Sequence, residues 1–119
     1  MGDMNDEPVN KSLQEVLGAK SPDSGAELVN LMWPDYVTGM GTYFYRGKWN
    51  MLDNLVVSKE LITGKRVRVE NQKGEIYSNP WMIYTHKNGD KTPNRSYAGN
   101  KYVGGVSDHF PVYFKMKVK

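Results

Sequence analysis

One stretch near the C-terminal end decides how this sequence is interpreted: Gly104-Gly105-Val106-Ser107-Asp108-His109-Phe110-Pro111-Val112. Its two glycines allow a sharp backbone turn, and Ser107, Asp108 and His109 follow the turn in a row. From Phe110 to Val118 apolar and polar residues alternate, which predicts a strand that leaves the turn. A carboxylate and an imidazole at the start of a strand favour a functional site, because loops supported by a rigid sheet carry much of protein function.

Length and composition indicate a single folded domain spanning residues 1–119. Hydrophobic residues make up 39% and charged residues 24% of the chain, which argues against disorder. The net charge of +3 is compatible with a phosphate-bearing partner but does not identify one. The absence of cysteine excludes disulfides, thiolate metal sites and a cysteine nucleophile. Without an apolar run long enough for a membrane span, or a signal segment at its start, the sequence predicts a soluble chain of undetermined location.

The pattern along the chain predicts an α+β fold with two short helices at the front and mostly antiparallel strands behind them. The helices are expected at residues 9–17 and 26–33, and Pro34 is expected to end the second. A hairpin is expected over residues 39–57, with its turn at Arg46-Gly47-Lys48. Further strands are predicted at 65–69 and 110–118, and the aromatic run 76–84 contains Pro80, which marks a break or an edge.

Asp53 lies in the returning strand of that hairpin, between apolar residues. A period of two places Met51, Asp53 and Leu55 on one face. Because a carboxylate among apolar neighbours is costly unless it is paired, two interpretations remain open. Either Asp53 is exposed on an edge strand, or it accepts a hydrogen bond from a donor such as an imidazole N–H.

The first residues form the segment Gly2-Asp3-Met4-Asn5-Asp6-Glu7-Pro8. On composition alone this segment is a frayed terminus, in which Asn5 or Asp6 could cap the helix that follows.

Three segments, taken in order, resemble the endonuclease/exonuclease/phosphatase superfamily. They are Gly2-Asp3-Met4-Asn5-Asp6-Glu7-Pro8, the run from Trp49 through Asp53-Asn54-Leu55-Val56-Val57-Ser58, and Gly105-Val106-Ser107-Asp108-His109-Phe110-Pro111-Val112. Met4 occupies a hydrophobic position of the first motif, and Asn54 is a slight departure from the second. The resemblance covers residues 2 to about 114.

The resemblance implies the C-terminal half of a DNase-I-like fold, a four-layer αββα sandwich made of two similar halves. The metal-binding Glu and an active-site Asn of the family lie in the other half, and neither Glu7 nor Glu15 is placed to replace that Glu. We therefore expect the chain to be a fragment that is inactive alone. An apolar sheet face left bare by the absent half would favour self-association.

The resemblance also implies metal-dependent hydrolysis of phosphate esters, with Mg²⁺ or Mn²⁺ as the ion. Asp3 would orient or deprotonate the attacking water, and Asn5 would donate a hydrogen bond to a phosphoryl oxygen. Asp108 would serve the metal. His109 would contact the phosphate or act as acid and base, and Asp53 would bind its other nitrogen and fix the tautomer.

Arg95, shortly before the glycine turn, is a further candidate that could bind a substrate phosphate through two N–H groups. A structural or surface role for this arginine is equally open.

Two other functions compete with the hydrolase. One is a non-catalytic remnant or partner-binding half-domain of the same fold. The other is a basic nucleic-acid-binding domain, against which the modest charge and the lack of a Lys/Arg stripe argue. The substrate itself, whether nucleic acid, phospholipid or sugar phosphate, stays undetermined at this level.

Overall fold

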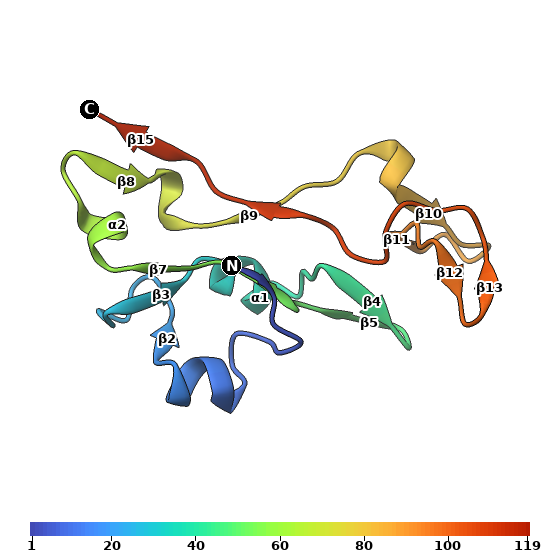
Figure 1. Ribbon diagram of the computed structural model, residues 1–119, viewed down its shortest axis with the longest axis horizontal. Coiled ribbons are helices and arrows are strands. Elements are labelled where there is room, and N and C mark those ends of the chain that lie inside the picture. Colours follow the sequence, from blue (N-terminus) through green and yellow to red (C-terminus); the bar gives the residue numbers. More distant parts are fainter.

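The computed structural model describes residues 1–119 as one elongated body of about 48 × 33 × 22 Å (Figure 1). Its helices are short: α1 (Trp33–Val37), α2 (Glu60–Thr63), the π-type turn η1 (Ser12–Val16) and the 3₁₀ turns η2 (Glu70–Gln72) and η3 (Pro80–Met82). None of these helices has the length and apolar character needed to cross a bilayer.

Short strands make up the rest of the regular structure. They are β1 (Gly2–Asp3), β2 (Ala19–Lys20), β3 (Leu28–Asn30), β4 (Tyr43–Tyr45), β5 (Lys48–Asn50), β6 (Asp53–Asn54), β7 (Val56–Ser58), β8 (Val67–Val69), β9 (Glu75–Ile76), β10 (Ile83–Thr85), β11 (Lys91–Pro93), β12 (Tyr97–Ala98), β13 (Lys101–Tyr102), β14 (Val112–Tyr113) and β15 (Met116–Val118). They form a three-stranded sheet, β2-β3-β7, and six two-stranded ladders: β1-β6, β4-β5, β8-β15, β9-β14, β10-β11 and β12-β13. Only β2 and β3 pair in parallel.

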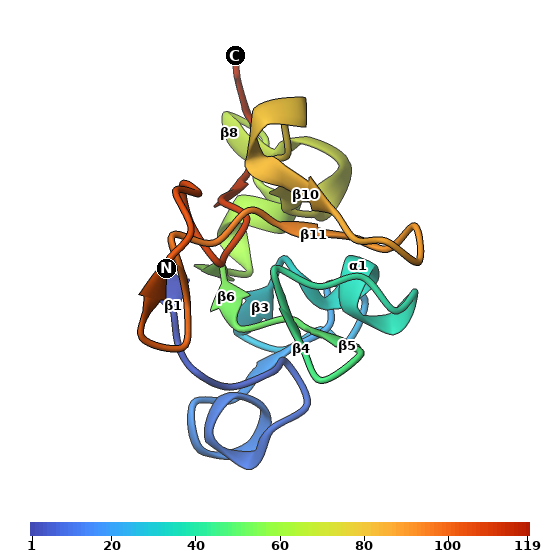
Figure 2. The ribbon, with the colours of Figure 1, turned by 90° about the vertical axis from the view of Figure 1, so that its right-hand side faces the viewer.

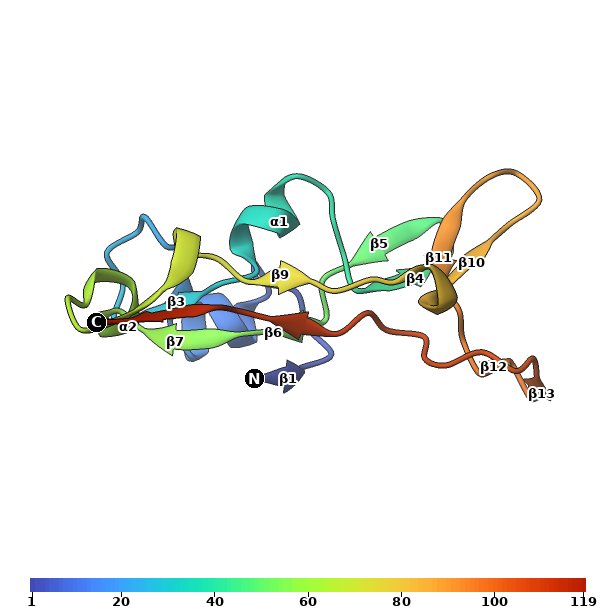
Figure 3. The ribbon, with the colours of Figure 1, turned by 90° about the horizontal axis from the view of Figure 1, so that it is seen from above.

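The two ends of the body differ in content. Figure 1 places β8 and β15 at one end and β10 to β13 at the other, and Figure 3 places β1 between the two ends. Figure 2 looks along the long axis onto the β10–β13 end. Because it combines short helices with mostly antiparallel strands, the fold belongs to the mixed α+β class predicted from the sequence.

The hydrophobic core lies where β3, β7, β8 and α2 meet. Its buried residues are Val29, Leu31, Met32, Met51, Leu55, Val57, Ile62 and Val69. Packing there is close at Gly74, where a Cβ would lie 2.6 Å from Met32 Sδ and 3.0 Å from Leu55 Cδ1. This part of the chain thus gains its order from apolar burial.

The helix predicted over residues 26–33 is wrong. Residues Leu28–Asn30 form β3, which pairs with β7, and the Leu31 N–H donates to the Leu55 carbonyl at 2.8 Å. The helix begins only at Trp33, where Pro34 occupies its first turn instead of ending a helix. Proline is tolerated at that position because the N–H it lacks would have no partner within the helix.

The other predicted elements are present in shortened or interrupted form. Residues 65–69 give β8, residues 110–118 give the two strands β14 and β15, and the break expected at Pro80 is η3. The helix expected at 9–17 is reduced to η1, and the hairpin is confirmed as β4 and β5. Arg46 (φ 48°) and Gly47 (φ 79°) form its turn, in the left-handed conformation that two-residue hairpin turns require. The return strand ends at Asn50, and the chain then continues as the separate strands β6 and β7.

Candidate functional site

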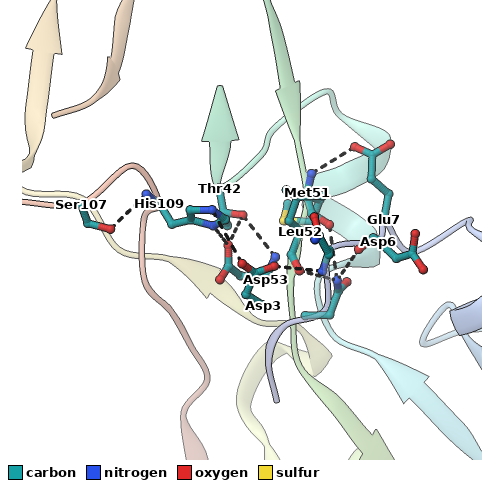
Figure 4. A network of polar contacts seen from close by, with 11 residues as sticks. Asp3, Asp6, Glu7, Thr42, Met51, Leu52, Asp53, Ser107 and His109 are labelled. Atoms are coloured by element: carbon teal, nitrogen blue, oxygen red, sulfur yellow. Dashed lines mark hydrogen bonds and ion pairs between the residues drawn. The ribbon is translucent and has the colours of Figure 1, made fainter. Parts of the chain in front are cut away.

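The first motif lies beside the second because β1 pairs antiparallel with β6. Asp3 is opposite Asp53 in the register, and Gly2 is opposite Asn54 (Figure 4). The N-terminal segment is therefore paired in a ladder and not frayed. Two carboxylates from distant parts of the chain consequently lie next to each other.

His109 lies between these two carboxylates. Its Nδ1 is 2.6 Å from Asp53 Oδ2, and its Nε2 is 3.8 Å from Asp3 Oδ2 (Figure 4). Because an ionised carboxylate can only accept, Nδ1 carries the proton in the shorter contact. The contact between Asp53 and an imidazole, one of the two interpretations of the sequence, is present. Asp53 and His109 are both largely buried, with 16% and 21% of their side chains exposed, whereas Asp3 is half exposed.

Thr42 supports the same carboxylate, and the sequence reasoning missed it. This fully buried residue donates its hydroxyl to Asp53 Oδ2 at 2.6 Å and accepts the Asp53 N–H at 3.3 Å. Its own carbonyl accepts the N–H of Phe110, the residue after the histidine, at 2.9 Å. The signal that could have found Thr42 is the need of a buried carboxylate for more than one donor.

Aromatic stacking orients the imidazole from a third side. Tyr43 stacks on His109 with 4.8 Å between ring centroids and 29° between the planes. Arg95 lies on Tyr43 in turn, with Cζ 6.0 Å from the ring centroid, and donates Nη2–H to the Phe44 carbonyl at 3.2 Å. Arg95 is thus connected to His109 through Tyr43, and the contacts do not test its expected role as a phosphate ligand.

The glycine turn packs on the residues before Arg95. The Asn94 carbonyl accepts the N–H groups of Val106 at 2.7 Å and Ser107 at 3.2 Å. A Cβ on Gly105 would lie 2.1 Å from the Arg95 carbonyl oxygen, so only glycine allows this approach. The Ser107 hydroxyl then accepts the His109 N–H at 3.1 Å. These contacts hold His109 in place from its own turn.

Asn54 anchors the N-terminal segment from inside the protein. It is fully buried, although the alternation of the predicted strand placed it opposite the face of Met51 and Leu55. Its amide accepts from Asn30 Nδ2 at 2.9 Å and donates to the Asp6 carbonyl at 2.9 Å. Glu7 Oε1 also accepts the Met51 N–H at 3.1 Å (Figure 4). The bonds of Asn54 and Glu7 hold the segment that carries Asp3 against β6.

Asn5 and Asp108, the remaining predicted site residues, are both exposed. Asn5 adopts φ 54°, a left-handed conformation that asparagine tolerates better than most residues, and its N–H donates to Asp3 Oδ1 at 2.9 Å. Asp108 makes no hydrogen bond or ion pair within the chain.

The residues present do not form a metal site. No group of three or more His, Cys, Asp or Glu side chains is placed to hold an ion. The ordinary oxygen-rich shell of Mg²⁺ or Mn²⁺ is therefore not assembled from this chain's residues alone.

Comparison with known proteins agrees with the motifs. The family model described as the Endonuclease/Exonuclease/phosphatase family matches residues 1–118, and the chain belongs to this family. No curated protein and no solved structure gives a match.

Proposed function

We propose that this chain carries the acid–base half of a phosphate-ester hydrolase site. The observation that supports the proposal is the imidazole of His109 between the carboxylates of Asp53 and Asp3, joined with membership of the family. A paired, largely buried histidine with one nitrogen directed toward a more exposed carboxylate is an arrangement suited to proton transfer.

The chemistry follows from the two ring nitrogens. Asp53 and Thr42 hold the Nδ1 side, so Nε2 is the atom that takes a proton from water or donates one to an ester oxygen. The 3.8 Å between Nε2 and Asp3 Oδ2 is too long for a direct hydrogen bond and suits a water molecule held by both groups. As that water attacks phosphorus its proton passes to Nε2, the ester P–O bond breaks, and the leaving oxygen takes a proton from solvent. The side-chain amide of Asn5 would donate to a phosphoryl oxygen as negative charge builds on it.

A requirement for Mg²⁺ or Mn²⁺ remains part of the proposal, and the hydrolysis assay described below tests it. Asp108 is the single proposed ligand, and no step above passes through a metal ion, because the residues present do not form a site for one.

We further propose that the chain forms half of a DNase-I-like sandwich and associates through its uncovered surface. Its radius of gyration is 15.7 Å, against about 13.5 Å expected for a compact domain of this length. Its accessible surface is 7771 Å², against about 6,600 Å² expected for a compact protein of this mass. The larger radius of gyration and accessible surface equally support the alternative of a non-catalytic, partner-binding half-domain.

Hydrolysis of bis-p-nitrophenyl phosphate by the 119-residue chain, with and without Mg²⁺ or Mn²⁺, tests the proposed chemistry. We expect no turnover by the chain alone, and turnover once a chain that carries the N-terminal half of the fold is added. In that assembly His109→Ala and Asp53→Ala should each reduce turnover about 10²- to 10⁴-fold, with the exposed Asp23→Ala as a matched control. Turnover that is unchanged by His109→Ala would overturn the acid–base assignment. A folded chain that does not turn over under any condition would favour the partner-binding alternative.

Light scattering over a range of concentrations tests the association. A dimer or larger species is expected, and a monomer at high concentration would contradict it.

A further inference from the structure

Beside the candidate site, at the β10–β13 end of the molecule (Figures 1 and 2), lies a cavity that the proposed chemistry does not use. Its volume is about 340 Å³, near the lower end of the range for small-molecule sites. Tyr84, His86, Thr92, Asn94 and Arg95 are among the residues that line it. We propose that this cavity is a subsite for the base of a nucleotide, so that the phosphate esters handled at His109 are nucleotide esters.

The lining combines an aromatic surface with polar groups. Tyr84 and His86 meet edge to face, with 4.8 Å between ring centroids and 87° between planes. A 2.8 Å hydrogen bond between His86 Nε2 and the buried Thr92 hydroxyl holds the imidazole in place. Among common components of phosphate esters, a nucleobase uses both features, because it has an aromatic face for stacking and an edge of donors and acceptors. A polyol headgroup has no aromatic face to stack.

Arg95 connects the cavity to the candidate site. It lines the cavity, and it also lies on Tyr43, which stacks on the imidazole of His109. Of its five N–H groups, one is bonded within the chain, to the Phe44 carbonyl. The remaining donors are available to a phosphate or to the acceptors of a base.

The backbone of residues 94–95 joins the cavity and the histidine turn into one unit. Asn94 and Arg95 line the cavity, and the Asn94 carbonyl accepts two N–H groups of the turn that carries His109. A molecule of mononucleotide size that occupies the cavity therefore has a fixed relation to the imidazole.

Charge favours a ligand that carries phosphate. Residues 79–105 hold four Lys or Arg and one acidic residue, and the rest of the chain holds twelve of each sign. The whole net charge of +3 therefore belongs to the segment that forms the cavity. A local positive field raises the concentration of anions at its surface.

The conclusion that the substrates are nucleotide esters rests on the proposed function. The test of the cavity measures ligand binding and does not require turnover. Binding of adenosine 5′-monophosphate, ribose 5-phosphate and adenosine is measured by calorimetry to the His109→Ala chain, in which hydrolysis is removed. We expect the monophosphate to bind at least about tenfold more tightly than either of the other two, because each lacks one of the two recognised parts.

Two variants show which side chain recognises the base and which recognises the phosphate. Tyr84→Leu keeps an apolar side chain without an aromatic face, and it should remove the advantage over ribose 5-phosphate. Arg95→Ala should remove the advantage over adenosine. Tyr77→Ala, at a tyrosine of similar exposure that does not line the cavity, is the matched control and should leave all three affinities unchanged.

Equal affinities for the monophosphate and ribose 5-phosphate, or a preference for the monophosphate that survives Tyr84→Leu, would overturn the subsite. If Tyr84→Leu does not fold, His86→Ala takes its place, and the comparison of the three ligands is decisive without either. If the model ester is hydrolysed but the three ligands bind without a preference for the base, only this inference is contradicted. A base preference together with no turnover, even after the N-terminal half of the fold is added, would contradict only the hydrolase.

Discussion

The core around β3, β7 and β8 and the hairpin region of residues 79–105 are ordered in different ways. The core buries eight apolar side chains against one another. In the hairpin region only Met82, Thr92 and Pro93 are buried, while the aromatic side chains of Trp81, Tyr84, Tyr97 and Tyr102 are exposed. Backbone and side-chain hydrogen bonds hold that region together.

The candidate site lies where the two regions meet. Asp53 comes from a strand next to the core, whereas His109 comes from a turn that packs on Asn94 and Arg95 of the hairpin region. The comparison teaches that Asp53 is held by a strand beside the core and by the Thr42 hydroxyl, whereas His109 is held by the hydrogen bonds of its turn and by stacking on Tyr43. Four substitutions test this difference, from the largest expected effect to the smallest.

Leu55→Ala in the core should give the largest loss of stability. Leu55 is almost fully buried, and removal of its side chain leaves a cavity that costs about 2–5 kcal/mol. Tyr97→Ala, at an exposed hairpin aromatic, should cost no more than about 0.5 kcal/mol. Urea unfolding of both variants measures the contrast, and comparable losses would show that the hairpin region also depends on burial.

Gly105→Ala should disturb the site from the hairpin side. The added Cβ would lie 2.1 Å and 2.2 Å from two backbone oxygens, which cannot move without shifting the chain, and the strain should cost about 1–3 kcal/mol. Hydrolysis of the model ester should fall together with stability, because the turn carries His109. Val106→Ala, at the exposed next residue, serves as the control. Full activity in Gly105→Ala would mean that the turn does not position the histidine.

Thr42→Val should have an intermediate effect that concerns Asp53. The change keeps the shape of the side chain but removes the hydroxyl donated to the carboxylate, at a cost of about 1.5 kcal/mol. Thr42→Ser should restore the bond and the activity. Thr63→Val, which removes an exposed hydroxyl, is the matched control. The pH profile of hydrolysis should change in Thr42→Val and not in the control, and an unchanged profile would leave Thr42 a purely structural role.

Tyr113→Phe should have the smallest effect, a small loss of stability below about pH 10 that fades at alkaline pH. The hydrogen bond that Tyr113 donates to Glu75 raises the pKa of the phenol above its ordinary value of 10.0, and desolvation and the negative charge of Glu75 act in the same direction. Because the folded pKa is the higher one, the stabilisation is fully present below about pH 10 and is lost as the pH rises through the raised pKa.

Absorbance titration of tyrosinate should show one of the eight tyrosines ionising late in the folded chain, and Tyr113→Phe should remove that component. A variant with the same titration curve would contradict the assignment.

Part of the site could be predicted from local sequence. Asp53 stood out because a carboxylate among apolar residues needs a partner, and His109 stood out because it follows a glycine turn at the start of a strand. Asp3 and Asn5 were found only through the resemblance of their motif to the family.

The error at residues 26–33 has an identifiable cause. Leu28, Leu31 and Met32 have the spacing of a helix face, but a short apolar run has the same appearance in a buried strand. This run forms a strand because β3 pairs with β7 and Leu31 packs against Gly74. Both β7 and Gly74 are distant from the run in sequence.

The sequence by itself determined the family and the α+β class, and the family resemblance implied the pairing of Asp53 with His109, because each of these depends on residue type and on order along the chain. Only the tertiary structure decided that Thr42 and Tyr43 support the pair, that Asn54 anchors the N-terminal strand, and that Arg95 lies behind Tyr43 beside a cavity. The physical reason is that hydrogen bonds and ring stacking act over a few ångströms between residues dozens of positions apart, and no local pattern records which of them meet.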